Sequence, residues 1–187
     1  MRVISGTRKG IVLKAPDGNV TRPTTDRIKE SLFSMIQFEL KDKICLDAFS
    51  GTGALGIEAI SRGARFCYLV EKNKKSCNVI KFNIEKVKLE KDIKLLNMDI
   101  FDAIKFFHKE KILFDIIFLD PPYNKGLVEQ FIKEIKEYPI LNNNCKIIVE
   151  EDIHNILKND IECENISLLK SKKYSNTIIN IYEYVML

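Results

Sequence analysis

The sequence lacks the features that mark membrane, secreted and metal-binding proteins. No apolar run approaches the roughly 18 to 20 residues that span a bilayer, and the first residues show no charged-then-apolar signal pattern. The five cysteines are an odd number without Cys-x-x-Cys spacing, which argues against a disulfide framework and a zinc site. Repeats and low-complexity linkers are missing as well. We therefore expect a cytoplasmic protein with reduced, mostly buried thiols and no metal.

The length and the charge distribution suggest one domain with a basic arm. The 187 residues suit a single α/β domain with a small appendage. Residues 1–29 carry seven basic and two acidic side chains, a net charge of +5, whereas the whole chain has +4. A phosphate backbone would bind such a segment, although a solvated surface arm explains the charge as well. We expect an arm over residues 1–25, a domain over residues 26–187, and a monomer.

Strand and helix patterns alternate along the chain. Short apolar runs bounded by turn residues predict strands over 44–47, 66–71, 93–98, 114–119 and 146–149. Apolar residues at helical spacing predict helices over 26–40, from 54 onward, and over 76–87, 103–109 and 126–138. Two short strands within 3–13 and a closing hairpin of 166–169 and 177–185 complete the pattern. Such alternation predicts an α/β fold.

One buried strand ends in an unusual polar loop, Asp120-Pro121-Pro122-Tyr123. The apolar residues before it are typical of a strand inside an α/β sheet, and Pro121 ends the pairing at the carboxyl edge, where such sheets bind ligands. The loop offers a carboxylate, a backbone carbonyl at Pro121, a stiffened chain and an aromatic face. These groups fit a planar base that carries an exocyclic amine.

The amine of such a base is a poor nucleophile, because its lone pair is delocalised into the ring. Two acceptors around the NH2 group, the Asp120 carboxylate and the Pro121 carbonyl, favour a pyramidal nitrogen whose lone pair points at an electrophile. Tyr123 would hold the ring by its face. The alternative is a strand end followed by a purely structural Asp-Pro turn, which the full four-residue sequence disfavours.

A second candidate site is the glycine-rich turn after Asp47. Gly51, Gly53 and Gly56 form a Gly-x-Gly-x-x-Gly pattern between a predicted strand and a predicted helix, the context in which this pattern binds a cofactor. Gly51 and Gly53 permit tight backbone geometry, and N–H groups at the start of the helix can bind a carboxylate or a phosphate. The glycines alone fit a nicotinamide dinucleotide and an adenosyl amino acid equally well.

Acidic residues at three strand ends favour the adenosyl amino acid. Asp47 would repel the pyrophosphate of a dinucleotide, but it can pair with the ammonium group of a methionine. Glu71 ends the next strand, where an acidic side chain can accept both ribose hydroxyls. Asp99 ends the third strand and can meet an adenine amino group, although it can equally cap the helix that follows.

Together these motifs resemble the class I, S-adenosylmethionine-dependent amino-group methyltransferases of nucleic acids. The segments Gly6-Thr7-Arg8-Lys9-Gly10 and Arg22-Pro23-Thr24-Thr25-Asp26-Arg27 are similar to those of the bacterial RsmD family, the guanine-N2 methyltransferases of small-subunit (16S) ribosomal RNA. The similarity runs through essentially the whole chain. It departs near Tyr174-Ser175-Asn176, where relatives often have a glycine, and this leaves the geometry of the closing hairpin open.

The resemblance implies a Rossmann-like class I methyltransferase fold: a seven-stranded, mostly parallel sheet, an antiparallel C-terminal hairpin and a small N-terminal β-hairpin. It implies S-adenosyl-L-methionine as the cofactor and ribosomal RNA within the small subunit as the partner. The catalytic loop is then Asp120, Pro121, Pro122 and Tyr123. The expected cofactor-binding residues are Asp47, Phe49, Ser50, Gly51, Gly53, Glu71, Lys72, Asp99 and Ile100.

The expected reaction is in-line methyl transfer to the amine of a flipped-out guanine, in which the enzyme mainly positions and desolvates. The amine becomes acidic only after methylation, so neither His108 nor His154 is assigned a role. Our candidates for RNA contacts are Arg8, Lys9, Arg22, Asn124 and Lys125.

Two alternatives to this reading stay open at this point. The first is a DNA adenine-N6 or cytosine-N4 methyltransferase, which usually needs a separate sequence-reading domain. The second is a dinucleotide-dependent oxidoreductase or a nucleotide-binding module without catalysis.

Overall fold

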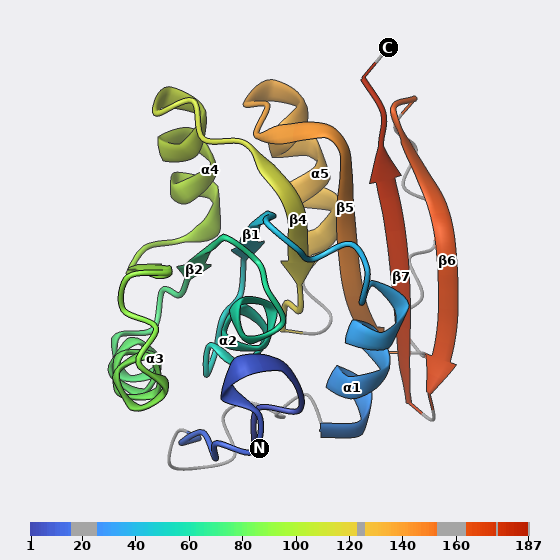
Figure 1. Cartoon of the computed structure of the whole chain (residues 1–187). Helices are drawn as coiled ribbons and strands as arrows, with labels where there is room; N and C mark the ends of the chain where they lie inside the picture. The colour runs from blue at the N-terminus through green and yellow to red at the C-terminus, as the bar shows by residue number, and fades with distance from the viewer. Residues whose placement is uncertain (16–25, 123–125, 153–163, 175, 187) are drawn as a thin grey trace.

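The computed structural model describes residues 1–15, 26–122, 126–152, 164–174 and 176–186. Its centre is a seven-stranded sheet in the order β3-β2-β1-β4-β5-β7-β6 (Figure 1). The strands are β1 (Ile44–Asp47), β2 (Phe66–Val70), β3 (Ile93–Leu96), β4 (Phe114–Leu119), β5 (Leu141–Asp152), β6 (Ile166–Tyr174) and β7 (Thr177–Tyr184). The first five strands are parallel, and β7 lies antiparallel between β5 and β6. The predicted sheet with its C-terminal hairpin is confirmed.

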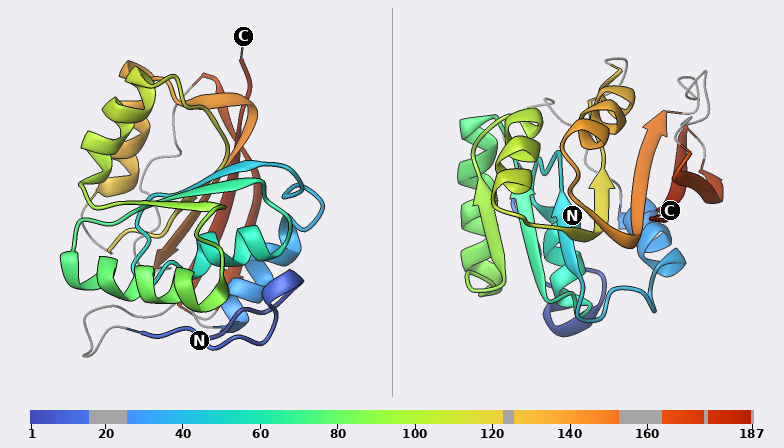
Figure 2. Two further views of the ribbon diagram at one scale, coloured as in Figure 1. Left: turned by 60° about the vertical axis from the view of Figure 1, so that its left-hand side comes forward. Right: turned by 90° about the horizontal axis from the view of Figure 1, so that it is seen from above.

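Helices cover both faces of the sheet (Figure 2). They are α1 (Asp26–Met35), α2 (Ala54–Ser61), α3 (Lys74–Val87), α4 (Ile100–Lys109) and α5 (Leu127–Glu137). The apolar stripes of α1, α2 and α3 pack into one core cluster, and those of α4 and α5 pack into another on the opposite face. The strand order reverses between β1 and β4. The chain therefore leaves these two strands toward opposite faces of the sheet, and a crevice forms between their carboxyl ends.

Most element boundaries lie within three residues of the predictions, and three differ by five residues. Helix α1 ends at Met35, and its apolar stripe continues through a turn in which Ile36 and Leu40 stay buried. Strand β5 begins at Leu141, five residues earlier than expected. Three consecutive asparagines follow Leu141, and because Asn is rare in strands, the start of β5 could not be recognised from the sequence. The paired strand β4 has a register irregularity at this level. Strand β6 extends to Tyr174, through lysines whose side chains are exposed.

The described part of the N-terminal arm, residues 1–15, is an antiparallel loop rather than a regular hairpin. Only Arg2 and Val12 form a β-bridge, and a 3-10 turn, η1 (Gly6–Arg8), closes the loop. Val3 and Leu13 are buried in the core cluster beneath α1 and α2. The division into an arm over 1–25 and a domain over 26–187 stays a prediction, since residues 16–25 lie outside the described part of the chain.

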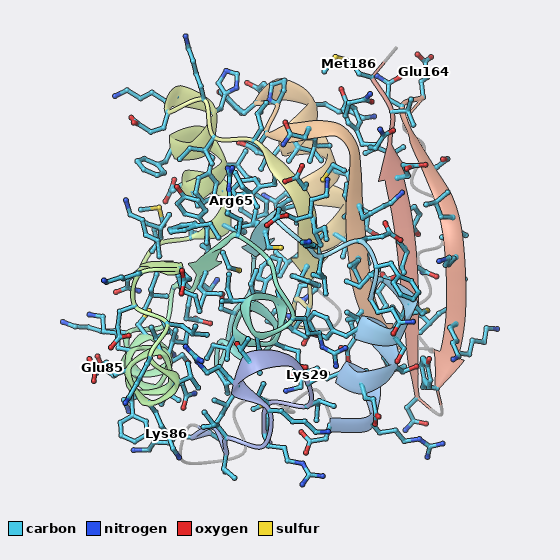
Figure 3. All side chains as sticks on the ribbon, in the orientation of Figure 1. Lys29, Arg65, Glu85, Lys86, Glu164 and Met186 are labelled. Atoms are coloured by element: carbon cyan, nitrogen blue, oxygen red, sulfur yellow. The ribbon has the colours of Figure 1, made fainter. Side chains whose placement is uncertain are left out.

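A buried charge network fastens the arm to α1 and α2. Glu58 is fully buried and accepts hydrogen bonds from the backbone N–H groups of Ile4 (2.8 Å) and Ser5 (3.0 Å). It also pairs with Arg62 Nε at 2.7 Å and with Lys29 Nζ at 3.3 Å. Figure 3 labels Lys29 between α1 and the arm, where burial lowers its pKa and Glu58 partly restores it. This network was not predicted, because nothing local in the sequence distinguishes Glu58 from a solvated helix residue.

Candidate active site

Backbone hydrogen bonds bring the predicted motifs to one edge of the sheet. In the parallel register, Asp47 at the end of β1 is level with Phe118 of β4, and the N–H of Ala48 donates to the Phe118 carbonyl at 3.1 Å. The N–H of Ser50 donates to the Val70 carbonyl of β2 at 3.0 Å. The glycine loop therefore lies between the ends of β2 and β4. Asp120 follows the end of β4 at the same edge.

The glycine loop has the tight geometry that its sequence predicted. Gly51 and Gly53 both adopt positive φ angles, 53° and 77°, which favour glycine. A Cβ on Gly56 would lie 2.2 Å from Leu69 Cδ2, so this third glycine lets α2 pack closely on β2. Gly53 caps α2 without a side chain, and the Ser50 hydroxyl turns back to donate to the Asp47 carbonyl at 2.8 Å. The loop thus presents backbone rather than side chains at the start of the helix.

Asp47 is a buried carboxylate in acidic surroundings. Its side chain is 2% exposed and accepts a hydrogen bond from the N–H of Gly56 at 3.2 Å. Burial raises the pKa of Asp47 to about 7, and the negative charges of Asp120 and Glu71 add to this effect, while the Gly56 N–H opposes it. A cation placed beside Asp47 would reverse the shift, because it favours the charged form. The site is therefore suited to a ligand with a positive group.

Glu71 is held in place by the loops around it. Its Oε2 accepts from the N–H of Gly51 at 2.9 Å, and its Oε1 accepts from the N–H of Asn73 at 2.7 Å. The Asn97 amide donates to the carbonyls of Glu71 (2.9 Å) and Lys72 (3.1 Å). A carboxylate oxygen can accept two hydrogen bonds, so the oriented group retains capacity for hydroxyl donors.

Asp99 performs the capping role that was one of its two predicted roles. It is the N-cap of α4, and its Oδ1 accepts from the N–H of Phe101 at 3.1 Å. Its Oδ2 lies 3.5 Å from Lys72 Nζ, which is exposed. Ile100 is buried at the start of α4, and Phe49 is half-buried against the cluster on the same face. Contact of these residues with an adenine stays a prediction.

The polar loop after β4 is described only in part. Asp120 is half-buried, Pro121 is buried and Pro122 is exposed, whereas Tyr123, Asn124 and Lys125 lie outside the described residues. The negative charge of Asp120 adds to the rise in the pKa of Asp47, as expected for two carboxylates at one edge of the sheet.

The adjacent end of β5 adds two acidic residues that the sequence analysis had not assigned to the site. The parallel register pairs Leu119 with Val149, so the buried Glu150 and Glu151 follow beside the polar loop. Burial, followed by the charge of Glu129, raises the pKa of Glu151 to about 7. Among the described residues, Glu151 Oε2 has no hydrogen-bond partner. The sequence signal that could have placed these two residues in the site is a pair of carboxylates directly after the predicted strand 146–149, at the same edge as Asp47 and Asp120.

The predicted RNA contacts have different surroundings. The Arg8 guanidinium caps the end of α3, where it donates to the carbonyls of Val87 (2.7 Å) and Lys88 (3.4 Å). Lys9 is exposed next to it, and Arg22 lies outside the described residues. Arg8 thus has a structural role in this arrangement, and RNA binding by either residue stays a prediction.

Cysteine and histidine side chains have structural surroundings in the described part of the chain. Its four cysteines are buried, free thiols. His108 is exposed on α4 and contacts the Pro139 carbonyl through Nδ1 at 3.1 Å, while His154 is outside the described residues. Within these ranges, no three His, Cys, Asp or Glu side chains are grouped as metal ligands would be, and no helix is long and apolar enough to cross a membrane.

Comparisons with known proteins match the chain over nearly its whole length. The family model described as "Conserved hypothetical protein 95" matches residues 1–183. A putative rRNA methyltransferase, YlbH of Bacillus subtilis, is 41% identical over 81% of this chain and 83% of its own length. The ribosomal RNA small subunit methyltransferase D of Haemophilus influenzae is 34% identical over 98% of this chain and 93% of its own. The solved structure of the putative methyltransferase yhhF of Escherichia coli superimposes with a TM-score of 0.85, at 29% identity, covering 99% of this chain and 98% of that one.

Proposed function

The chain belongs to the family described as conserved hypothetical protein 95, and on that premise we propose that it methylates the exocyclic N2 amine of a guanine in small-subunit ribosomal RNA. The relatives named ribosomal RNA small subunit methyltransferase D support the substrate. The main structural support for methyl transfer is that Asp47, Glu71 and Asp120 lie around a glycine loop at one edge of the sheet. The protein acts as a cytoplasmic monomer, with S-adenosyl-L-methionine as methyl donor.

The residues at this edge fit that cofactor. When bound, S-adenosyl-L-methionine supplies a methyl group on a positively charged sulfonium. The buried Asp47 carboxylate would balance an ammonium group, which explains a burial that is unfavourable without a cation. Gly51 and Gly53 keep side chains out of the space above the loop, and the oriented Glu71 would accept ribose hydroxyls. Ser50, Phe49, Lys72, Asp99 and Ile100 complete this proposed set.

The polar loop would prepare the guanine amine for attack. Asp120 and the carbonyl of Pro121 accept hydrogen bonds from the NH2 group, so the nitrogen lone pair is directed away from the ring and toward the methyl group. Pro122 has no N–H to compete for these acceptors. After methylation the amine is acidic and releases its proton without a dedicated base. Tyr123 would stack on the ring, with Asn124 and Lys125 beside the flanking phosphates.

The decisive experiment identifies the modified nucleoside. The purified protein is incubated with methyl-labelled S-adenosylmethionine and, separately, with unmethylated small-subunit particles, naked ribosomal RNA and duplex DNA, and the digested products are analysed by mass spectrometry. We expect N2-methylguanosine from a ribosomal RNA substrate. Methylated adenine or cytosine would contradict the proposed substrate but support the proposed reaction. Transfer to none of the three would indicate a nucleotide-binding module without catalysis.

A further inference from the structure

Strand β6 forms an exposed basic edge at one side of the sheet. It is the last strand in the spatial order, and its residues from Ser167 to Lys173 are all exposed. Lys170, Lys172 and Lys173 are its only charged residues, so the strand has a net charge of +3. We call these three lysines together with Tyr174 the β6 edge. Its outer side has no neighbouring strand in the part of the chain that the structure describes.

Two contacts with α1 anchor the β6 edge while leaving two lysines available. The Tyr174 hydroxyl is hydrogen-bonded to the Ser31 hydroxyl, and Lys170 Nζ donates to the Met35 carbonyl at 3.3 Å. Lys172 Nζ lies 5.3 Å from the centre of the Tyr174 ring. Neither Lys172 nor Lys173 has an acidic partner among the described residues. Two positive charges on a fixed strand are thus free to meet an anion.

The β6 edge leads to the candidate active site. Strands β5 and β6 are both antiparallel to β7, so β6 ends at the same edge of the sheet as β4 and β5 (Figure 1). Thr177, the first residue of β7, pairs with Asp152 of β5 and with Tyr174 of β6. Three strand spacings, about 14 Å, separate β6 from β4. That distance corresponds to a few nucleotides of RNA rather than to a remote surface.

We propose that the β6 edge binds the phosphate backbone of the substrate RNA a few nucleotides from the methylated guanine. The inference rests on the proposed function and adds to it a docking surface. Lysine side chains neutralise phosphates, and the outward-facing N–H groups of an edge strand can donate to phosphate oxygens. Tyr174, partly buried against the core cluster and bonded to Ser31, anchors the end of the strand nearest the target and so positions the lysines beside it.

Lysines on an edge strand also have a protective role, because they prevent strands of different molecules from pairing. The test must separate this role from RNA binding. Glutamate keeps an edge charged, and so keeps it protected, but repels phosphate. Arginine keeps both properties. The informative variants are therefore K172E/K173E and K172R/K173R.

RNA affinity is measured for each variant over a range of salt concentrations, together with methyl-transfer kinetics, cofactor binding by calorimetry and oligomeric state. For K172E/K173E we expect the slope of log K against log salt to shrink by about 1.4 or more, since each phosphate contact on a single strand contributes about 0.7. KM for RNA should rise, while kcat, cofactor affinity and the monomeric state should not change. K172R/K173R should resemble the original protein. K91E/K109E, with the same charge change at exposed lysines near the opposite ends of the strands, is the matched control.

An unchanged salt slope and KM in K172E/K173E would overturn the proposal. An equal loss of RNA affinity in K91E/K109E would also overturn it, because the effect would then depend only on the net charge of the protein. A loss seen with intact particles but not with naked RNA would assign the edge to a protein of the particle and would also contradict it. If the original protein methylates no RNA, the proposed function fails instead, a result distinct from these comparisons.

Discussion

Asp47 is a residue at which ligand binding and stability oppose each other. An aspartate with an ordinary pKa of 3.8 in the unfolded chain has a pKa of about 7 in the folded protein. The folded state therefore holds the proton more tightly, so the unfolding free energy falls as pH rises from about 4 to about 7 and stays low above that. The full shift corresponds to roughly 4 kcal/mol, since one pKa unit is about 1.36 kcal/mol.

We predict that Asp47→Asn makes the ligand-free protein more stable at pH 8, by about 2 to 4 kcal/mol, and changes its stability little below pH 4. The same substitution should weaken the binding of S-adenosylmethionine, because it removes the partner of the ammonium group. Urea denaturation at several pH values and calorimetry with the cofactor measure the two effects. A variant that is less stable than the original protein at pH 8 would contradict this account of the site.

Asp120 is expected to act mainly in the transition state. Asp120→Ala should lower kcat by about 10²- to 10³-fold, the usual effect of removing one oriented hydrogen-bonding group, while the dissociation constant of the cofactor stays nearly the same. Single-turnover methyl transfer with saturating cofactor measures the chemical step. Asp102→Ala, which removes an exposed carboxylate from α4, is the control and should leave kcat unchanged. Equal rates for Asp120→Ala and the original protein would remove Asp120 from the mechanism.

At the scale of elements, the arm depends on close approach to α2. Gly6 and Gly10 both have positive φ angles, 82° and 88°, so both would be strained by a side chain. Their surroundings differ. A Cβ on Gly6 would lie 1.7 Å from the Ser61 carbonyl oxygen, whereas a Cβ on Gly10 meets nothing within 4 Å. Comparing alanine substitutions at the two glycines therefore separates the effect of arm packing from the effect of backbone strain, which is common to both positions.

We predict that Gly10→Ala lowers the unfolding free energy by about 1 to 2 kcal/mol, the cost of a left-handed alanine. Gly6→Ala should lower it by more, because the arm must move away from α2. Hydrogen exchange at the N–H groups of Ile4 and Ser5, which donate to the buried Glu58, should then accelerate in Gly6→Ala only. Equal exchange rates in the two variants would show that the arm tolerates this displacement.

At the scale of the whole molecule, the arm and the β6 edge are separate candidate contacts for one RNA. Lys9 is exposed in the arm, and no ion pair joins it to β6 in the part of the chain that the structure describes. Lys9→Ala should therefore reduce the salt slope of RNA binding by about 0.7, and combining it with K172E/K173E should add the two reductions. Titrations of the single and combined variants check this. A combined effect no larger than that of K172E/K173E would mean that the arm does not touch phosphate.

The sequence predicted the parts of the molecule that depend on local patterns. Asp47 ends β1, and Glu71, Asp99 and Asp120 follow the ends of β2, β3 and β4. Parallel strands bring their carboxyl ends to one edge, so local spacing was sufficient to place these residues together. The bond from Ser5 to Glu58 joins residues 53 positions apart, and no periodicity encodes it. Lys29 was counted in the charge of the basic segment 1–29, yet it is fully buried and pairs with Glu58 of another element.

The position of β7 has a consequence for synthesis of the chain. β7 is the last strand to be made, but it lies inside the sheet, between β5 and β6. While the chain emerges from the ribosome, β5, whose centre is the apolar run Ile147–Val149, retains an unpaired edge until Thr177–Tyr184 has been translated. An open apolar edge is prone to pair with other chains. A chain that stops shortly before Thr177 would thus lose the middle of its sheet rather than its margin.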